Sequence, residues 1–123
     1  MLNHYRNYLR HLPFAGTVVV SWVILFTPES GVPTAPPGTD KVVHLLLFAA
    51  LAGTGRLARL PAAPLLVGLV GYAALSEVLQ ELLPIGRSGD WVDALVDIIG
   101  AGLGWAFTAE LAGKLRRDRR TTG

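Results

Sequence analysis

The stretch GRSGDWVDALVDIIGAGLG, residues 86–104, decides the fold of this chain. It begins polar and turns into an apolar helix that still carries Asp93 and Asp97, followed by Gly100 and Gly104. Residues three and four apart are neighbours on a helix surface, so the two acids and the two glycines share one face. Ionisable groups inside an apolar span are costly and usually mark function. The glycine spacing is typical of helices that pack closely, either within a bundle or between copies.

Length and composition point to a single membrane domain over residues 1–123. Hydrophobic residues make up 51% of the chain and charged residues 16%, and the apolar ones form long runs separated by segments rich in proline and glycine. Such runs are typical of several transmembrane helices and not of a soluble amphipathic bundle. The chain has no cysteine, which excludes disulfides and thiolate chemistry.

The predicted fold is an all-α integral membrane bundle of four transmembrane helices. Proline, glycine and charged residues separate the apolar runs and set their limits. The helices are expected at about 9–26, 40–57, 64–83 and 91–111, with a basic C-terminal tail at 112–123. The first run also resembles a secretory signal peptide, with a basic start and an apolar middle. No A-x-A cleavage site follows it, so retention of this helix is expected.

Basic residues are distributed unevenly between the two sides of this bundle. One side would hold nine of them and the other only Lys41 and Arg87. Because positively charged segments stay in the cytoplasm, both termini are predicted to be cytoplasmic, in a multi-pass protein of the inner membrane. The basic tail is expected to meet anionic lipid of the bilayer and not nucleic acid. The nine residues are Arg6, Arg10, Arg56, Arg59, Lys114, Arg116, Arg117, Arg119 and Arg120.

Three predicted helices bring polar side chains to a similar depth below the outer surface. Glu77 lies six residues before the end of the third helix, and Asp97 six residues after the start of the fourth. A helix rises about 1.5 Å per residue, so each lies roughly 9 Å below the surface, and His44 lies about 6 Å below Asp40. We therefore expect one outward-facing polar pocket.

The pocket is expected to hold more carboxylates than fixed cations. Some of these acids must be protonated, paired with His44, hydrogen-bonded to Gln80 or bound to a cation. No cofactor is predicted, although a divalent cation is an alternative. Glu81 and Asp90 are expected to form a solvated rim or a helix cap. The predicted pocket residues are Glu77, His44, Asp93, Arg87, Gln80, Asp40, Asp97 and Lys41.

These motifs resemble the signature of the VanZ-like membrane proteins over about 40–104. They are Asp40-Lys41-x-x-His44-x-x-x-Phe48, Glu77-x-x-Gln80, Arg87-x-x-Asp90-x-x-Asp93 and Gly100-x-x-x-Gly104. Asp97 departs from the family pattern, in which asparagine is expected. The resemblance implies a small bacterial membrane protein, in a family named for a member that lowers sensitivity to the glycopeptide teicoplanin. It implies no established reaction or substrate.

Three functions follow as hypotheses from these residues. The first is binding of an anionic lipid head group, a lipid-linked cell-wall precursor or a glycopeptide in the outward-facing pocket. The second is metal-assisted hydrolysis or transfer at a lipid phosphate inside the membrane. Binding is favoured over catalysis because the sequence has no recognised nucleophile or compact metal motif. The third is a structural protein that forms homo-oligomers through Gly100 and Gly104.

Overall fold

The computed structural model describes residues 2–27, 38–84 and 90–122 of the chain. Nearly all of these residues are helical, and no strand occurs among them. The prediction of an all-helical fold with four helices is therefore confirmed. The helices are α1 (Leu2–Phe26), α2 (Thr39–Leu57), α3 (Ala62–Leu82) and α4 (Trp91–Thr122).

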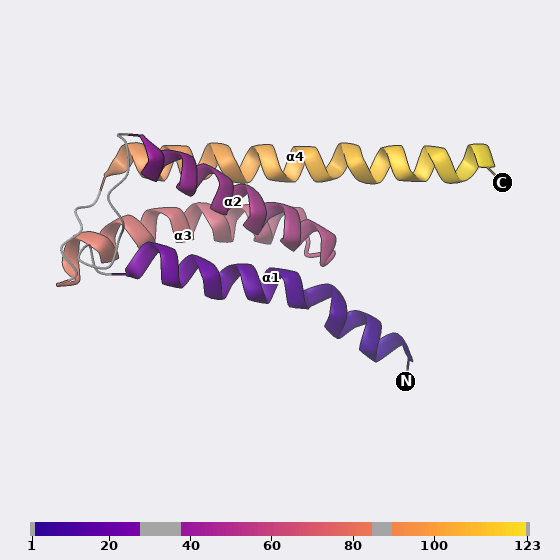
Figure 1. Cartoon of the computed structure of the whole chain (residues 1–123), viewed down its shortest axis with the longest axis horizontal. Helices are drawn as coiled ribbons and strands as arrows, with labels where there is room; N and C mark the ends of the chain where they lie inside the picture. Colours follow the sequence, from indigo (N-terminus) through magenta and orange to yellow (C-terminus); the bar gives the residue numbers. More distant parts are fainter. Residues whose placement is uncertain (1, 28–37, 85–89, 123) are drawn as a thin grey trace.

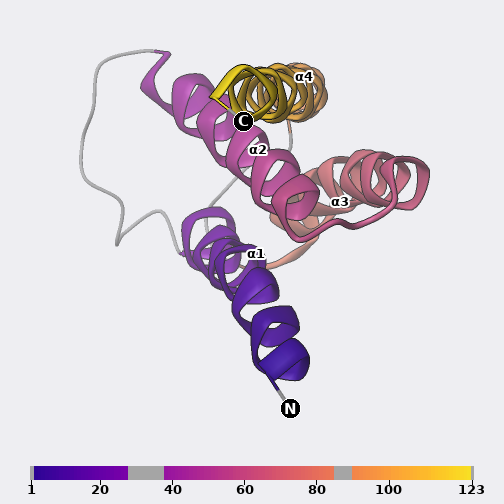
Figure 2. The same cartoon turned by 90° about the vertical axis from the view of Figure 1, so that its right-hand side faces the viewer.

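The four helices form an up-and-down bundle with α2 at its centre (Figures 1 and 2). α2 packs most extensively against α4 and also contacts α1 and α3, whereas α1 and α3 touch each other only slightly. The end of α1, the start of α2, the end of α3 and the start of α4 lie together at one end of the bundle (Figure 1). The N- and C-termini lie at the opposite end. Polar residues near these four helix ends are therefore neighbours.

Glycine residues allow α2 and α4 to approach each other closely. A Cβ atom added at Gly104 would lie 2.6 Å from the Cα of Ala49, and one added at Gly100 would lie 3.1 Å from the Cα of Leu45. Both additions would also overlap the carbonyl oxygens of the same α2 residues. Gly53 contributes from the α2 side, since a Cβ there would meet the Thr108 methyl group at 3.2 Å. The glycine face of α4 is therefore covered within the chain, which leaves it no room to pair with a second copy.

The described helices are apolar on the outside as well as in the core. Leu25, Phe48, Leu51 and Ala73 are buried at the centre of the bundle. Large apolar side chains are also exposed along the outer faces, among them Leu46, Val67, Leu75, Ile99 and Leu103. Such an exterior is expected where the surrounding solvent is lipid.

Three of the four helices are long and apolar enough to cross a membrane. The corresponding segments are Tyr8–Phe26, Ala62–Leu82 and Trp91–Thr122. α2 is not among them, because its 19 residues include Asp40, Lys41 and Arg56.

Two helices are longer than predicted. α1 begins at Leu2, not near residue 9, and α4 continues to Thr122, so the predicted tail at 112–123 is largely helical. Glu110, Lys114 and Asp118 follow one another four residues apart, which allows opposite charges to interact along this extension. Arginine and lysine also have high helix propensity. A charged composition was therefore a poor guide to where the helix ends.

Replacement of Gly104 by leucine is expected to separate α2 from α4. The new side chain would have to displace the backbone at Ala49, and overpacking of this kind costs about 1–3 kcal/mol. The matched control is Gly102→Leu on the same helix, where a Cβ would meet no atom within 4 Å. Unfolding of the purified protein in detergent should show a loss of stability for Gly104→Leu alone. Equal stabilities of the two variants would contradict this packing.

Candidate functional site

Polar side chains gather at the end of the bundle opposite the termini. We define the polar cluster by residues of α2 (Asp40, Lys41 and His44), of α3 (Glu77) and of α4 with the residue before it (Asp90, Asp93 and Asp97). His44, Glu77, Asp93 and Asp97 are buried. Arg87, also predicted for the pocket, lies outside the described residues. Three helices that are distant in sequence thus contribute ionisable groups to one place.

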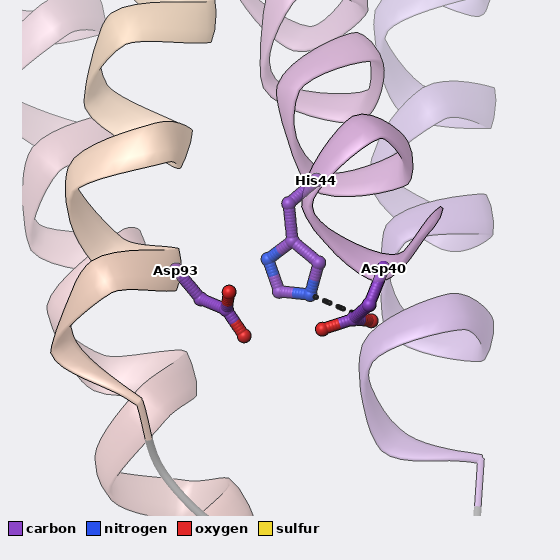
Figure 3. Close-up of side chains that lie close together, drawn as sticks. All are labelled: Asp40, His44 and Asp93. Carbon is purple, nitrogen blue, oxygen red and sulfur yellow. Dashed lines mark ion pairs between the residues drawn. The ribbon is translucent and has the colours of Figure 1, made fainter. Parts of the chain in front are cut away.

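His44 and Asp97 form the innermost contact of the cluster. The distance between His44 Nδ1 and Asp97 Oδ1 is 2.8 Å, and the two side chains are 1% and 0% exposed. The other ring nitrogen, Nε2, lies 3.6 Å from Oδ1 of Asp40 on the preceding turn of α2 (Figure 3). The imidazole ring is therefore held between a buried and an exposed carboxylate.

Lys41 joins α2 to the start of α4. Its Nζ donates hydrogen bonds to Oδ1 of Asp93 at 2.9 Å and to Oδ2 of Asp90 at 3.2 Å. The Asp93 side chain is only 8% exposed, whereas those of Lys41 and Asp90 are about half exposed, at 42% and 45%. This cation therefore sits at the surface and compensates the charge of the carboxylate beneath it.

Asp90 connects α3 to α4 and caps α4. Its Oδ1 accepts a hydrogen bond of 2.9 Å from the backbone N–H of Val92, as expected of an N-cap residue. Its own backbone N–H donates to Oε2 of Glu77 at 2.8 Å. The hydrogen bond from the Val92 N–H, and to a smaller extent that from the Lys41 ammonium, hold the pKa of the Asp90 carboxyl below its usual value. Both interactions favour the charged form of this carboxyl.

Glu77 and Asp97 each keep one carboxylate oxygen without a hydrogen-bond partner among the described residues. These atoms are Oε1 of Glu77 and Oδ2 of Asp97, and both are buried. One ligand atom from each of His44, Glu77 and Asp97 lies within 4.8 Å of the others. The same holds for one ligand atom from each of Asp40, His44 and Asp93, which also lie within 4.8 Å of one another. These arrangements have the chemistry of a cation site.

Gln80 is buried, and in the described part of the chain its amide nitrogen bonds to α1 and not to the carboxylates. Its Nε2 donates a hydrogen bond of 2.9 Å to the backbone carbonyl of Leu25, in the last turn of α1. The carbonyl groups at the end of a helix lack partners within that helix, so this bond satisfies one of them. Gln80 therefore fastens α3 to α1 below the polar cluster.

A pocket of about 360 Å³ lies next to the polar cluster, between the end of α3 and the start of α4. It is lined by Glu77, Val78, Glu81, Leu82 and Trp91. Glu81 is exposed, in agreement with its predicted place on the rim. Glu77 thus belongs to the buried cluster and also contributes to the lining of a pocket whose other walls include the apolar residues Val78, Leu82 and Trp91.

Two contacts of polar side chains between different helices are not predicted from the sequence. The hydroxyl groups of Ser21 and Tyr72 are 2.7 Å apart and link α1 to α3. At the other end of α2, the Arg56 guanidinium lies 4.0 Å from the centre of the Trp105 ring, a cation–π contact. Single polar residues within apolar runs were the available signal, but their spacing does not identify a partner on another helix.

The fold and the polar cluster define a helical protein with an apolar exterior suited to a membrane and a buried ionisable site at one end. No model of a known protein family, no curated protein and no solved structure matches the chain.

Acid should weaken the contribution of Asp90 to stability. The pKa of this carboxyl is lowered on folding, so its contribution is complete above its ordinary pKa of about 4 and is lost as the pH falls through the lowered value. Asp90→Asn keeps a side chain that can cap α4 but removes the charge that pairs with Lys41. The melting temperature of the wild type should exceed that of the variant at pH 7, and the difference should shrink below about pH 4. A difference that stays constant throughout the acid range would contradict this role.

Proposed function

We propose that the chain is a VanZ-like protein of the bacterial cell envelope in which all four helices cross the inner membrane and both termini lie in the cytoplasm. The order and spacing of the motifs from Asp40 to Gly104 support the family, and the three apolar helices support a membrane location. The excess of basic residues toward the termini supports the orientation. In this orientation the polar cluster lies just beneath the outer surface of the membrane.

α2 is proposed to cross the membrane as well, although it is not among the three helices that are apolar enough by composition alone. Its charged residues lie near its ends, Asp40 and Lys41 at one and Arg56 at the other, so that between them only His44 is titratable. α1, α3 and α4 all pack against α2, which reduces its contact with lipid. A central helix can therefore span the membrane with a lower hydropathy than its neighbours.

The proposed activity is binding of the polar head of an envelope lipid or of a lipid-linked cell-wall precursor. The observation that carries this proposal is the position of Glu77, which is part of the buried cluster and also lines the pocket between α3 and α4. Val78, Leu82 and Trp91 supply apolar walls for the start of a lipid chain. A volume of about 360 Å³ falls within the usual range of small-molecule sites, about 300–1,000 Å³.

The charge of the pocket indicates which part of such a ligand it would hold. Glu77 and Glu81 are acceptors, so they suit the hydroxyl, amide or amine donors of a sugar, peptide or amine head group. Lys41 is engaged by two acids of the cluster. Arg87, which precedes α4 in the sequence, would suit a phosphate of the ligand, because a guanidinium group matches phosphate oxygens. A glycopeptide, which also carries amine and hydroxyl donors, is a second ligand of the same chemical kind.

Native mass spectrometry of the purified protein with its co-purified lipids tests this proposal. Glu77→Gln should weaken binding about tenfold or more, because a hydrogen bond to a charged group contributes about 1.5–3 kcal/mol. The control is Glu110→Gln, an exposed acid toward the other end of α4. The same pair of variants should differ in cells challenged with teicoplanin, with Glu77→Gln alone altering sensitivity. Identical lipid occupancy and identical sensitivity for both variants, at normal expression, would contradict the proposal.

A further inference from the structure

We propose that His44, Glu77 and Asp97 form a binding site for one divalent transition-metal ion, with Zn²⁺ as the ion that suits them best. This site concerns the buried side of the polar cluster and does not depend on the lipid or glycopeptide proposed above. The three residues come from α2, α3 and α4, so an ion held there would join three helices.

The geometry places three ligand atoms around a common point. One atom from each residue lies within 4.8 Å of the other two. Ligands of a tetrahedral zinc ion lie about 2.0–2.2 Å from it, so two of them are about 3.3–3.6 Å apart. Rotations of the three side chains that draw their ligand atoms closer together would close the site around an ion.

Unpartnered oxygens provide the second, independent indication of a ligand. Glu77 and Asp97 are 2% and 0% exposed, and each has one buried oxygen without a hydrogen-bond partner in the described structure. The other oxygen of each is held, by the Asp90 backbone N–H and by His44 Nδ1 respectively. A buried carboxylate oxygen that lacks a partner is costly. Such an oxygen is satisfied when it coordinates a cation.

The charges around the site favour a divalent ion. Lys41 is bonded to Asp90 and Asp93 on the surface side, so its positive charge is directed to those acids. Two carboxylates and a neutral imidazole carry a charge of −2, which a divalent ion balances. Burial of the balanced set costs less than burial of separate charges.

The ligand set distinguishes between classes of metal ion. Mg²⁺ and Ca²⁺ prefer sites made only of oxygen ligands, six or more in number. Imidazole nitrogen suits zinc and the other late first-row ions, and three protein ligands with one open position are typical of zinc sites that bind water or a substrate. One histidine with two carboxylates therefore favours Zn²⁺.

Titration of the full-length protein in detergent with Zn²⁺, against a chromophoric chelator, tests the site without any lipid ligand. We expect one Zn²⁺ per chain, and Glu77→Gln and Asp97→Asn should each weaken binding about 100-fold or more, since even the loss of a residue that only supports a ligand costs 10–100-fold. His44→Gln should do the same, whereas its matched control His11→Gln, an exposed histidine of α1, should bind normally. Absence of binding by the wild type, or full binding by Glu77→Gln, would overturn the proposal.

A second readout on the wild-type chain covers the case in which a variant fails to fold. Zn²⁺ should raise the melting temperature and shift the imidazole ¹⁵N resonances of His44 but not those of His11. Unchanged His44 resonances under saturating Zn²⁺ would show that the imidazole binds no metal, and would overturn the proposal. Because these measurements contain no lipid or glycopeptide, their failure leaves the proposed function standing, and failure of the lipid experiment leaves the metal site standing.

Discussion

The close approach of α2 and α4 at Gly100 and Gly104 is the constraint on which the rest of the structure depends. Each glycine lies against the backbone of one α2 residue, Leu45 and Ala49 respectively, so the pair fixes both the distance and the register between the helices. His44 directly precedes Leu45, and the partner of His44, Asp97, lies one helical turn before Gly100. The glycine contacts therefore place the imidazole and the carboxylate within 2.8 Å of each other, and a slip of either helix would separate them.

The remaining contacts bring α3 to this helix pair at the same end of the bundle. Glu77 accepts the Asp90 backbone N–H at the start of α4, and Lys41 joins α2 to the same segment. The side-chain amide of Gln80 then links α3 to the last turn of α1 by a hydrogen bond. Buried ionisable groups seldom stabilise a protein more than well-packed apolar groups of similar size would. This comparison supports the proposal that the polar cluster binds a ligand.

Much of the helical arrangement could be predicted from the sequence, because apolar runs and glycine and proline breaks are local signals. The similar depth of His44, Glu77 and Asp97 followed from counting residues along three helices. The pairing of His44 with Asp97 could not be predicted, since Asp40 shares a helix face with His44 and was an equally plausible partner. The bond from Gln80 to Leu25 was equally inaccessible, because it depends on how α1 packs against α3. Helical continuation through the basic residues after 111 is not predicted, because a run of charges equally marks the end of a membrane-spanning segment.

The central claim is that the register set by the two glycines brings His44 and Asp97 into direct contact inside the bundle. Solid-state NMR of the protein in lipid bilayers, with ¹⁵N-labelled histidine and ¹³C-labelled aspartate, measures this contact through the dipolar coupling between His44 Nδ1 and the Asp97 carboxylate carbon. The structure predicts a measurable coupling, because the nitrogen lies 2.8 Å from an oxygen of that carboxylate. That coupling should disappear in Asp97→Leu, which removes the carboxylate. Absence of the coupling in the folded wild-type protein would contradict the account.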